Sequence, residues 1–449
     1  MSFPRYPKYK ASGVGWLGDV PMDWKISRLG FESWIRARLG WKGLKAEEYV
    51  DDGFAFLSTP NIKETEIDFE NVNFIDQHRF DESPEIKLRE GDVLLAKDGS
   101  TLGTVNIVRT LPRPTTVNSS IAVITPNSRL AGVFLYYLFE SSYMEHTIQR
   151  IKGGMGVPHL FQADLNKFYL PLPSQTEQTQ IASFLDRETT KIDGLVREQR
   201  RLIELLKEKR QAVISHAVTK GLNPHAPVKP SGIEWLGEIP EHWATPAVFA
   251  RYQAVLGKML DEKQLTGAHP ICYLRNADVN WDRINIADLP VFDIEPDDVE
   301  RFSLRPGDIL ICEGGAGIGQ TAIWQGELDR CAFQKALHRL RPWSDDEDPR
   351  FFYYCMRNAV ETGVVLAGGT ATIPHLTGEQ LRKYRFPRPP IKEQNQIVAY
   401  LDCETGKLDA LTAEAERGIE LLQERRAALI SAAVTGQIDV RNFIFQENT

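Results

Sequence analysis

The chain has 449 residues, of which 42% are hydrophobic and 25% charged, and its formal net charge is -8. At roughly 100–200 residues per domain this length predicts two to four domains, and the composition excludes a wholly disordered chain. No apolar run reaches the ~18 residues of a membrane span and the first ten residues do not resemble a signal peptide, so we expect a soluble cytoplasmic protein.

The cysteines argue against two kinds of stabilising cross-link. Their number is odd and none form a C-x-x-C pair, so neither a disulfide framework nor a zinc knuckle is expected. All of them lie in the second half of the chain, as Cys272, Cys312, Cys331, Cys355 and Cys403.

The first third of the chain predicts a mixed α/β globule. It opens with "SGVGWLGDVPMDW" at residues 12–24 and continues with short apolar segments that turn residues separate: "GFAFLST", "GDVLLAKDG" and "NSSIAVITP". Such segments are typical of strands. A helical stretch, "VFLYYLFESSYMEHTI", and a Gly-rich turn, "GGMGVPHL", complete the globule.

Residues 174–219 predict one long helix. Ser174 and Glu177 fit a capping box, and Gly221 follows as a stop. At 1.5 Å per residue such a helix is roughly 65 Å long. Apolar side chains recur every seven residues with a second, interleaved position, which indicates a coiled-coil seam made of Leu185, Ile192, Leu195, Leu202, Leu206 and Val213.

The second half of the chain repeats this order. "SGIEWLGEIPEHW" (residues 231–243) matches the opening block at an offset of 219, and "LRPGDILICEGGAGIG" (residues 304–319) matches residues 88–103 at 216. Residues 387–409 match residues 171–193, again at 216. The second seam comprises Leu401, Leu408, Leu411, Leu422 and Leu429. The interiors, residues 25–87 and 244–303, barely match, which suggests two similar modules that read different things.

The expected fold class is α+β, with two mixed α/β globules separated by a long antiparallel two-helix coiled coil and related by a pseudo-twofold internal duplication. The alternative is that each helix lies only on its own globule. The C-terminal tail should end near the N-terminus. The predicted parts are a first globule (1–172), a first helix (173–222), a second globule (223–388), a second helix (389–440) and a tail (441–449).

A search for catalytic motifs favours binding over catalysis. No Walker A, H-E-x-x-H or G-x-S-x-G motif occurs, and "GGAGIG" after an apolar strand is typical of a turn. His159 and His375 hold matching places in "PHL". They are open to a role as general bases, but no partner can be fixed for them, so a structural role is favoured.

The repeated blocks resemble the DNA-specificity subunit of Type I restriction–modification systems. The resemblance rests on "SGVGWLGDVPMDW", "GDVLLAKDG", "LPLPSQTEQTQIASFLDRETTKID" and "LLKEKRQAVISHAVTKG", each with its second copy, and covers about residues 10–441. It implies that the globules are target-recognition domains, each reading one half of a split, asymmetric DNA site. It also implies that the helices fix the distance between the half-sites.

The resemblance further implies the partners. Two methyltransferase subunits would dock on the helices, and ATP-driven restriction–translocase subunits would join them on double-stranded DNA. The chain itself would be non-catalytic and bind no cofactor or metal, because S-adenosylmethionine, ATP and magnesium belong to the partner subunits. Deleting about one heptad within residues 195–213 should shorten the unread gap by a base pair or so, or abolish assembly.

Candidate base-reading residues are polar or basic side chains in the turn regions. Arg to guanine and Asn to adenine are the natural pairings. In the first globule the candidates are Lys97, Ser100, Thr101, Arg109, Arg113, Asn118, Lys152, Gly153 and Gly154; in the second they are Arg275, Asn276, Arg330, Lys335, Arg339 and Thr370. Cys312 and Glu313 stand where the first copy has Ala96 and Lys97, so the two readers should differ chemically there.

The acidic charge qualifies this expectation. No segment is strongly basic, so the chain alone should bind DNA weakly, with partner subunits supplying the remaining phosphate contacts. The competing interpretation is a non-catalytic coiled-coil scaffold that presents two domains to proteins or glycans. It explains the seam and the charge and leaves the family motifs unexplained.

Overall fold

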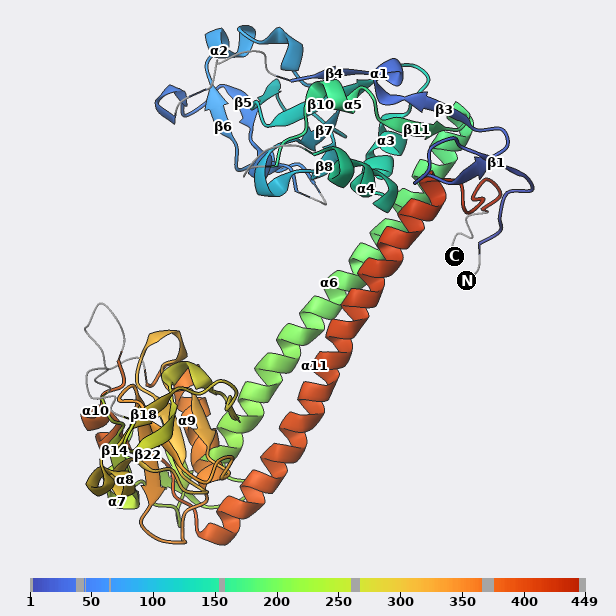
Figure 1. The fold of residues 1–449 in the computed structure, drawn as a ribbon. Helices are drawn as coiled ribbons and strands as arrows, with labels where there is room; N and C mark the ends of the chain where they lie inside the picture. The colour runs from blue at the N-terminus through green and yellow to red at the C-terminus, as the bar shows by residue number, and fades with distance from the viewer. Residues whose placement is uncertain are drawn as a thin grey trace. The chain divides into compact units, whose positions relative to one another are not determined.

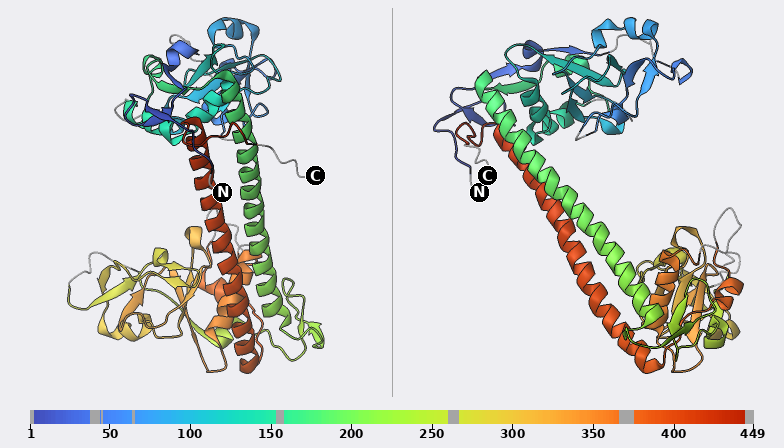
Figure 2. Two further views of the ribbon diagram at one scale, coloured as in Figure 1. Left: turned by 90° about the vertical axis from the view of Figure 1, so that its right-hand side faces the viewer. Right: turned by 180° about the vertical axis from the view of Figure 1, so that it is seen from behind.

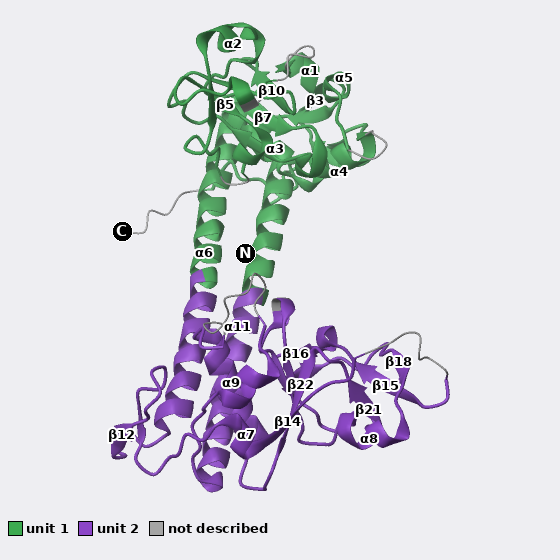
Figure 3. Cartoon of the chain, turned by 90° about the vertical axis from the view of Figure 1, so that its left-hand side faces the viewer, with its two compact units in different colours: residues 1–200, 417–449 green, residues 201–416 purple. Residues whose placement is uncertain are grey.

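A computed structural model describes residues 3–37, 44, 46–63, 66–152, 158–259, 267–365 and 375–443 (Figure 1). The chain divides into two compact units (Figure 3). Unit 1 is Met1–Arg200 with Arg417–Thr449, and unit 2 is Arg201–Glu416. Each unit therefore contains one globule and part of both long helices. The boundaries between globule and helix that the sequence suggests, at residues 172, 222, 388 and 440, remain predictions. None of the helices in the described ranges combines the length and apolarity that crossing a membrane requires.

The globule of unit 1 is built on two small sheets. The larger has the antiparallel order β4-β10-β7-β8, and the smaller has the order β6-β5-β9, with β5 and β9 parallel. Two separate strand pairs, β1 with β2 and β3 with β11, lie nearer the long helices (Figure 1). The strands are β1 Tyr9–Ala11, β2 Asp19–Pro21, β3 Lys25–Arg28, β4 Ser33–Arg36, β5 Phe54–Leu57, β6 Asn73–Ile75, β7 Val93–Ala96, β8 Val105–Ile107, β9 Thr115–Val117, β10 Ile121–Pro126 and β11 Tyr169–Leu172.

Apolar helices cover the larger sheet of unit 1. All six residues from Phe134 to Phe139 on α3 are buried, in one cluster with Val93, Val105 and Ile124 of the sheet. Burial of this surface is the main stabilising contribution to the globule. The helices of this part are α1 Leu29–Glu32, α2 Gln77–Asp81, α3 Gly132–Phe139, α4 Ser142–Ile151 and α5 Gln162–Leu165, with 3₁₀ turns η1 Ala46–Glu48, η2 Thr59–Asn61, η3 Pro84–Ile86 and η4 Gly99–Thr101.

Unit 2 repeats both sheets with the same topology. Its larger sheet has the order β14-β22-β19-β20, and its smaller sheet β18-β15-β21 contains one parallel pair, β15 with β21. Its elements are β12 Val228–Pro230, β13 Glu238–Pro240, α7 Val248–Arg251, β14 Tyr252–Leu256, β15 Pro270–Leu274, η6 Asn276–Asp278, β16 Val279–Asn280, β17 Arg283–Ile284, β18 Val291–Asp293, α8 Pro296–Phe302, β19 Ile309–Cys312, η7 Gly315–Gly317, β20 Thr321–Ile323, β21 Cys331–Phe333, β22 Leu337–Pro342, α9 Pro349–Glu361 and α10 Gly378–Lys383.

The two long helices are α6 (Gln175–Lys220, 46 residues) and α11 (Ile391–Val434, 44 residues). The backbone N–H of Glu177 donates to the Ser174 hydroxyl, as the predicted cap requires, while the Glu177 carboxylate accepts from Tyr6 instead of closing the box. Gly221 ends α6 with a φ of +73°, a conformation that glycine adopts without strain. Both boundaries thus follow from local sequence.

The helices run antiparallel within each unit, side by side in both views of Figure 2. In unit 1, Arg426 lies 3.1 Å from Asp193. In unit 2, Arg210 lies 3.3 Å from Asp409. The 216-residue offset relates Asp193 to Asp409 and Arg210 to Arg426, so one ion pair occurs twice with its ends exchanged. This exchange is the signature of an internal twofold repeat.

The apolar seam differs in part from the heptad prediction. Leu185, Ile192, Leu206, Leu401, Leu408 and Leu429 are buried, and Val213 and Leu422 are partly buried. Leu195, Leu202 and Leu411 are not in the seam, since they are 52%, 42% and 49% exposed. The buried positions are Val196 and Ile203, one residue further on, and Ala415, one turn after Leu411. The reason is that a straight α-helix has 3.6 residues per turn and drifts away from a strict seven-residue repeat.

A repeated glutamine holds each globule to its helix. Gln178 of α6 is fully buried, donates to the carbonyls of Arg129 and Pro173 and accepts from Ala131 N–H. Its counterpart Gln394 on α11 makes the same three kinds of bond, with Asp346, Pro389 and Asp348. The "E-Q" of the repeated motif is therefore a structural clamp.

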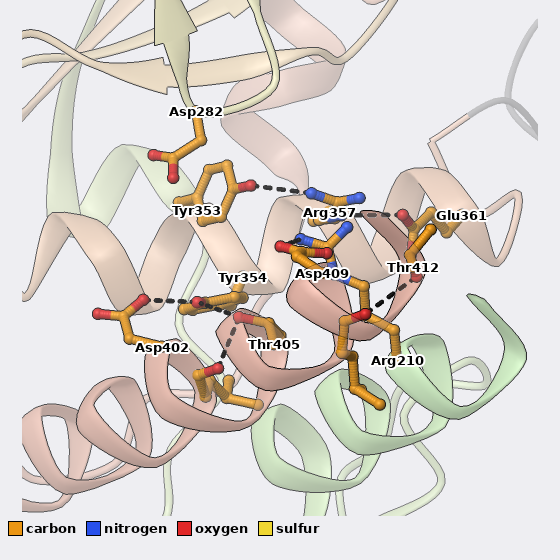
Figure 4. Close-up of polar contacts among 12 residues, drawn as sticks. Arg210, Asp282, Tyr353, Tyr354, Arg357, Glu361, Asp402, Thr405, Asp409 and Thr412 are labelled. Atoms are coloured by element: carbon orange, nitrogen blue, oxygen red, sulfur yellow. Dashed lines mark hydrogen bonds and ion pairs between the residues drawn. The ribbon is translucent and has the colours of Figure 1, made fainter. Parts of the chain in front are cut away.

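A tyrosine–aspartate contact reinforces each clamp. In unit 2 the Tyr354 hydroxyl donates to Asp402 at 2.6 Å and lies 3.4 Å from the Thr405 hydroxyl (Figure 4). In unit 1, Tyr137, Asp186 and Thr189 form the same group, at 2.8 and 3.2 Å. The chain ends meet in unit 1, where the backbone N–H of Asp439 donates to the Pro4 carbonyl at 2.8 Å, as the twofold repeat predicts.

Candidate nucleic-acid interface

Equivalent turns stand at one end of the larger sheet in the two units. The first follows β7 and contains Lys97 and Asp98; the second follows β19 and contains Glu313 and Gly314. Backbone bonds hold each turn on both sides: Lys97 N–H donates to Ser120, and its carbonyl accepts from Leu160. Glu313 bonds in the same way to Ala336 and Leu376. The turns are thus rigid platforms on which side chains can vary.

The histidines of the two "PHL" motifs brace these turns. His159 forms a bridge to Asp98, and its ring binds the Asp98 carboxylate. His375 forms the equivalent bridge to Gly314, where a Cβ on the glycine would lie 2.5 Å from the ring Nδ1. A carboxylate thus contacts the ring in unit 1, whereas in unit 2 the ring packs on bare backbone. Each histidine therefore contacts the turn of its own globule.

Four predicted residues of the first globule gather at this end of the sheet. Lys97 lies 3.4 Å from Asp98, and its side chain is 12% exposed. Ser100 is exposed on η4, beside the half-buried Thr101. Asn118 bonds by its backbone N–H to Leu57 and by its side-chain oxygen to Ser120 N–H. The cluster therefore combines one cation with hydroxyl and amide groups.

Three predicted residues of the second globule form the corresponding cluster. Asn276 donates from its backbone to the Gln334 side chain and from its amide nitrogen to Gly314. Its amide oxygen is buried and has no hydrogen-bond partner among the residues that the structure describes. Arg275 makes a bidentate pair with Asp278, and Lys335 is exposed on the next loop. The platform residue is Glu313 rather than a lysine, so the two clusters carry different donors and acceptors.

The remaining predicted residues lie elsewhere. Arg109 binds Asp186 of α6 at 2.8 Å and so joins the contact between globule and helix. Arg113 pairs with Asp52 and stacks over Phe74 before β9 begins, and Arg330 is exposed before β21, so both lie at the far end of the smaller sheet. Lys152 is exposed at the end of α4. Gly153, Gly154 and Thr370 lie outside the described residues.

Arg339 is buried, which corrects its prediction as a base-reading residue. It is 1% exposed and donates to the carbonyls of Arg301 and Ser303, each at 3.0 Å. Burial lowers the pKa of its guanidinium to about 10. A side chain that already bonds two carbonyls inside the sheet is not available to a base edge.

The first globule fills the same position from the opposite strand. Arg36 on β4 donates to the carbonyls of Glu85 and Lys87, the equivalents of Arg301 and Ser303 at the 216-residue offset. Arg36 stands opposite Val123, whereas Arg339 stands opposite Val255. The arginine and the valine have therefore exchanged strands between the two copies.

One exposed aromatic residue at the first cluster, Phe161, was not among the residues predicted from the sequence. Phe161 is 56% exposed, and its ring centroid lies 4.4 Å from that of His159. The second copy has Thr377 at this position. This difference between the copies is the sequence signal from which Phe161 could have been found. An exposed ring beside hydrogen-bonding groups suits stacking on a base or wedging into a groove.

The electrostatics of the clusters fit base contacts better than metal binding. Across the described ranges, no group of three or more His, Cys, Asp and Glu side chains is arranged to hold a metal ion. Cys312, beneath the second platform, is buried, which raises the pKa of its thiol to about 12 and keeps it neutral at ordinary pH. The groups that remain accessible are hydrogen-bond donors and acceptors.

Comparisons with known proteins agree with this architecture. The family model described as the Type I restriction modification DNA specificity domain matches residues 44–205 and again residues 259–421. A putative type I restriction enzyme MjaX specificity subunit from Methanocaldococcus jannaschii is 23% identical, over 95% of this chain and 96% of its own length. The EcoKI specificity subunit of Escherichia coli K12 is 21% identical, over 94% and 90%.

Solved structures share the fold. A chain from a study of complex assembly and conformational transition in the type I R-M system superposes with a TM-score of 0.72 at 20% identity, covering 92% of this chain and 98% of that one. The HsdS subunit from Thermoanaerobacter tengcongensis gives 0.57 at 19% identity, covering 93% and 98%. With two matches of the family model that together span most of its length, the chain belongs to the Type I restriction–modification DNA-specificity family.

Proposed function

We propose that the chain is the sequence-specific DNA-recognition subunit of a Type I restriction–modification complex. The observation that carries this proposal is a turn with the same backbone hydrogen bonds in both units that carries two different side-chain clusters. The cluster of unit 1 presents a lysine and an aspartate, Lys97 and Asp98. The cluster of unit 2 presents Glu313 and Asn276 instead. Two readers of unlike donors and acceptors on one chain suit a bipartite, asymmetric site.

The long helices are the proposed docking surface for two methyltransferase subunits. Relatives named as restriction-enzyme specificity subunits, and a similar chain from a type I complex, support an assembly of this kind. In this proposal the chain has no catalysis of its own and works in the cytoplasm on the host chromosome. S-adenosylmethionine, ATP and magnesium then bind to the methyltransferase and restriction–translocase partners.

The charge distribution explains why partners are needed. The chain is acidic overall, and two of the predicted arginines are neutralised, Arg113 by Asp52 and Arg275 by Asp278. With a formal net charge of -8, the chain has no excess of cations for DNA phosphates, so little affinity comes from counter-ion release. The alternative of a protein- or glycan-binding scaffold shares the acidic charge, and only a DNA-binding measurement separates it.

A gel-shift titration on duplex DNA tests the proposal. We expect the purified chain alone to bind weakly, and the chain with its methyltransferase subunit to bind at least ~100-fold more tightly at the same salt concentration. Tight, salt-insensitive binding by the chain alone would contradict the charge argument. Failure of the complex to bind any duplex, under conditions where it assembles, would favour the scaffold.

A further inference from the structure

The unit-1 end of α6 carries a buried aromatic residue that the chain's own ends cover. Phe184 is 1% exposed. The ring of Phe3 packs edge-on against it with centroids 5.4 Å apart, and the ring of Phe443 does so at 4.9 Å. Two separate segments, one from each terminus, therefore close over one helical face.

The repeat-equivalent residue of unit 2 is uncovered. Tyr400 on α11 corresponds to Phe184 at the 216-residue offset and is 41% exposed. Here the chain runs on from Gly221 into β12 as a single segment, whereas unit 1 has two segments in the corresponding place. Leu222, the counterpart of Phe3, is itself 41% exposed. One segment does not cover the face that two segments cover in unit 1.

The uncovered face is a mostly apolar hollow of about 600 Å³ within unit 2, here called the Tyr400 hollow. A hollow of this size has room for an aromatic side chain with its neighbouring backbone. In the part of the chain that the structure describes, Lys209 at its rim has no acidic partner. Its lining includes Lys209, Val213, His216, Leu222, Pro224 and Tyr400.

We propose that the Tyr400 hollow binds an aromatic side chain of another protein, on a segment that carries a carboxylate next to that residue. The aromatic preference follows from unit 1, where Phe3 and Phe443 occupy the equivalent face. The carboxylate preference follows from Lys209 and His216 at the rim. A second copy of the chain is a poor occupant, because its own terminal phenylalanines are already packed in unit 1. The docking site does not depend on the function proposed above.

Peptide titration of the full chain, followed by ligand-observed NMR, tests this site. The probe is the capped dipeptide acetyl-Asp-Phe-amide, with acetyl-Asp-Ala-amide and acetyl-Asn-Phe-amide as comparisons. We expect saturable binding of the first, with a Kd on the order of 1 mM. The alanine peptide should bind at least ~10-fold more weakly and the asparagine peptide a few-fold more weakly, since each lacks one of the two recognised groups.

Two matched protein variants locate the binding. Ala212→Trp places a large side chain in the hollow, and Ala428→Trp places the same side chain at the repeat-equivalent position of unit 1. Both alanines are exposed, so both variants should fold. We expect at least a ~10-fold loss of affinity in Ala212→Trp and wild-type affinity in Ala428→Trp.

Three results would overturn the proposal. The first is no saturable binding of the Asp-Phe peptide up to ~20 mM. The second is equal binding by wild type and Ala212→Trp, or by the phenylalanine and alanine peptides. The third is self-association of the chain, measured by sedimentation, that Ala212→Trp abolishes and Ala428→Trp does not, because the occupant would then be a second copy.

Discussion

At the scale of single residues, the two copies keep an interaction while exchanging the strands that supply it. Arg36 and Arg339 bind equivalent backbone carbonyls, yet they come from opposite strands. Sequence comparison pairs Arg339 with Val123 and so presents the arginine as a novelty of the second globule. The compensating valine, Val255, lies where the copies barely match, so the exchange was invisible without the strand register.

The exchange predicts what happens when the arginine of the second globule is moved from β22 to β14. Arg339→Val should lower the free energy of unfolding by about 1–3 kcal/mol, because it removes the donor to the Arg301 carbonyl and leaves Arg341 as the donor to the Ser303 carbonyl. Adding Val255→Arg should restore more than half of that loss, since the guanidinium then stands as Arg36 does in the first globule. Denaturant unfolding followed by circular dichroism measures both. A single variant within ~0.5 kcal/mol of wild type would contradict the structural role.

A buried histidine predicts how stability depends on pH. His338 lies inside unit 2 and contacts the Leu376 carbonyl at 2.7 Å. Burial lowers its pKa below the ordinary value of 6.5, and the carbonyl and Glu313 offset this only in part. Because the unfolded chain then binds the proton more readily, its contribution to stability is complete above about pH 6.5 and is lost as the pH falls below it.

Thermal unfolding of wild type and His338→Gln between pH 7.5 and 5.5 checks this sign. The wild-type midpoint should fall more steeply with decreasing pH than that of the variant. Parallel slopes in the two proteins would show that other groups control the acid side.

At the scale of elements, the long helices were predictable because their signals are local and repeated. The caps and the seven-residue spacing predicted both helices and placed the ends of α6 and the start of α11 to within about two residues, but α11 ends at Val434, before the predicted boundary at residue 440. The exact seam was less predictable, as Leu195, Leu202 and Leu411 show, because a straight α-helix drifts away from a strict seven-residue repeat. Arg109 was predicted to contact DNA, but it pairs with Asp186 of α6, because the globule packs against this helix.

The repeated interhelical ion pair predicts an asymmetric effect of two equivalent mutations. Arg426 bonds both Asp193 and Glu140 of its globule, whereas Arg210 has only Asp409 as a carboxylate partner among the described residues. Arg426→Ala should therefore cost about 1–3 kcal/mol, and Arg210→Ala less than about 0.5 kcal/mol, because the one carboxylate partner of Arg210, Asp409, is 57% exposed. Equal losses in chemical denaturation would contradict the added contribution of Glu140.

At the scale of the whole molecule, the sequence predicted the duplication directly, whereas it predicted the residues of the candidate site only in part. Matching blocks identified two globules and two helices, and the model of the family agrees with them in both halves. The candidate site was half predictable: Lys97, Asn118, Arg275 and Asn276 lie at the equivalent platforms, while Arg339 does not. Turn residues can be predicted from local composition, but the burial of a strand residue depends on partners that are distant in the sequence.

We propose that one chain carries two unlike DNA readers. A genome-wide map of methylated adenine, in a host that has the cognate methyltransferase, with and without this gene, tests this proposal. We expect methylation only when the gene is present, at a motif of two different short segments that a fixed unread gap separates. A continuous motif, two identical half-sites, or methylation that persists without the gene would contradict it.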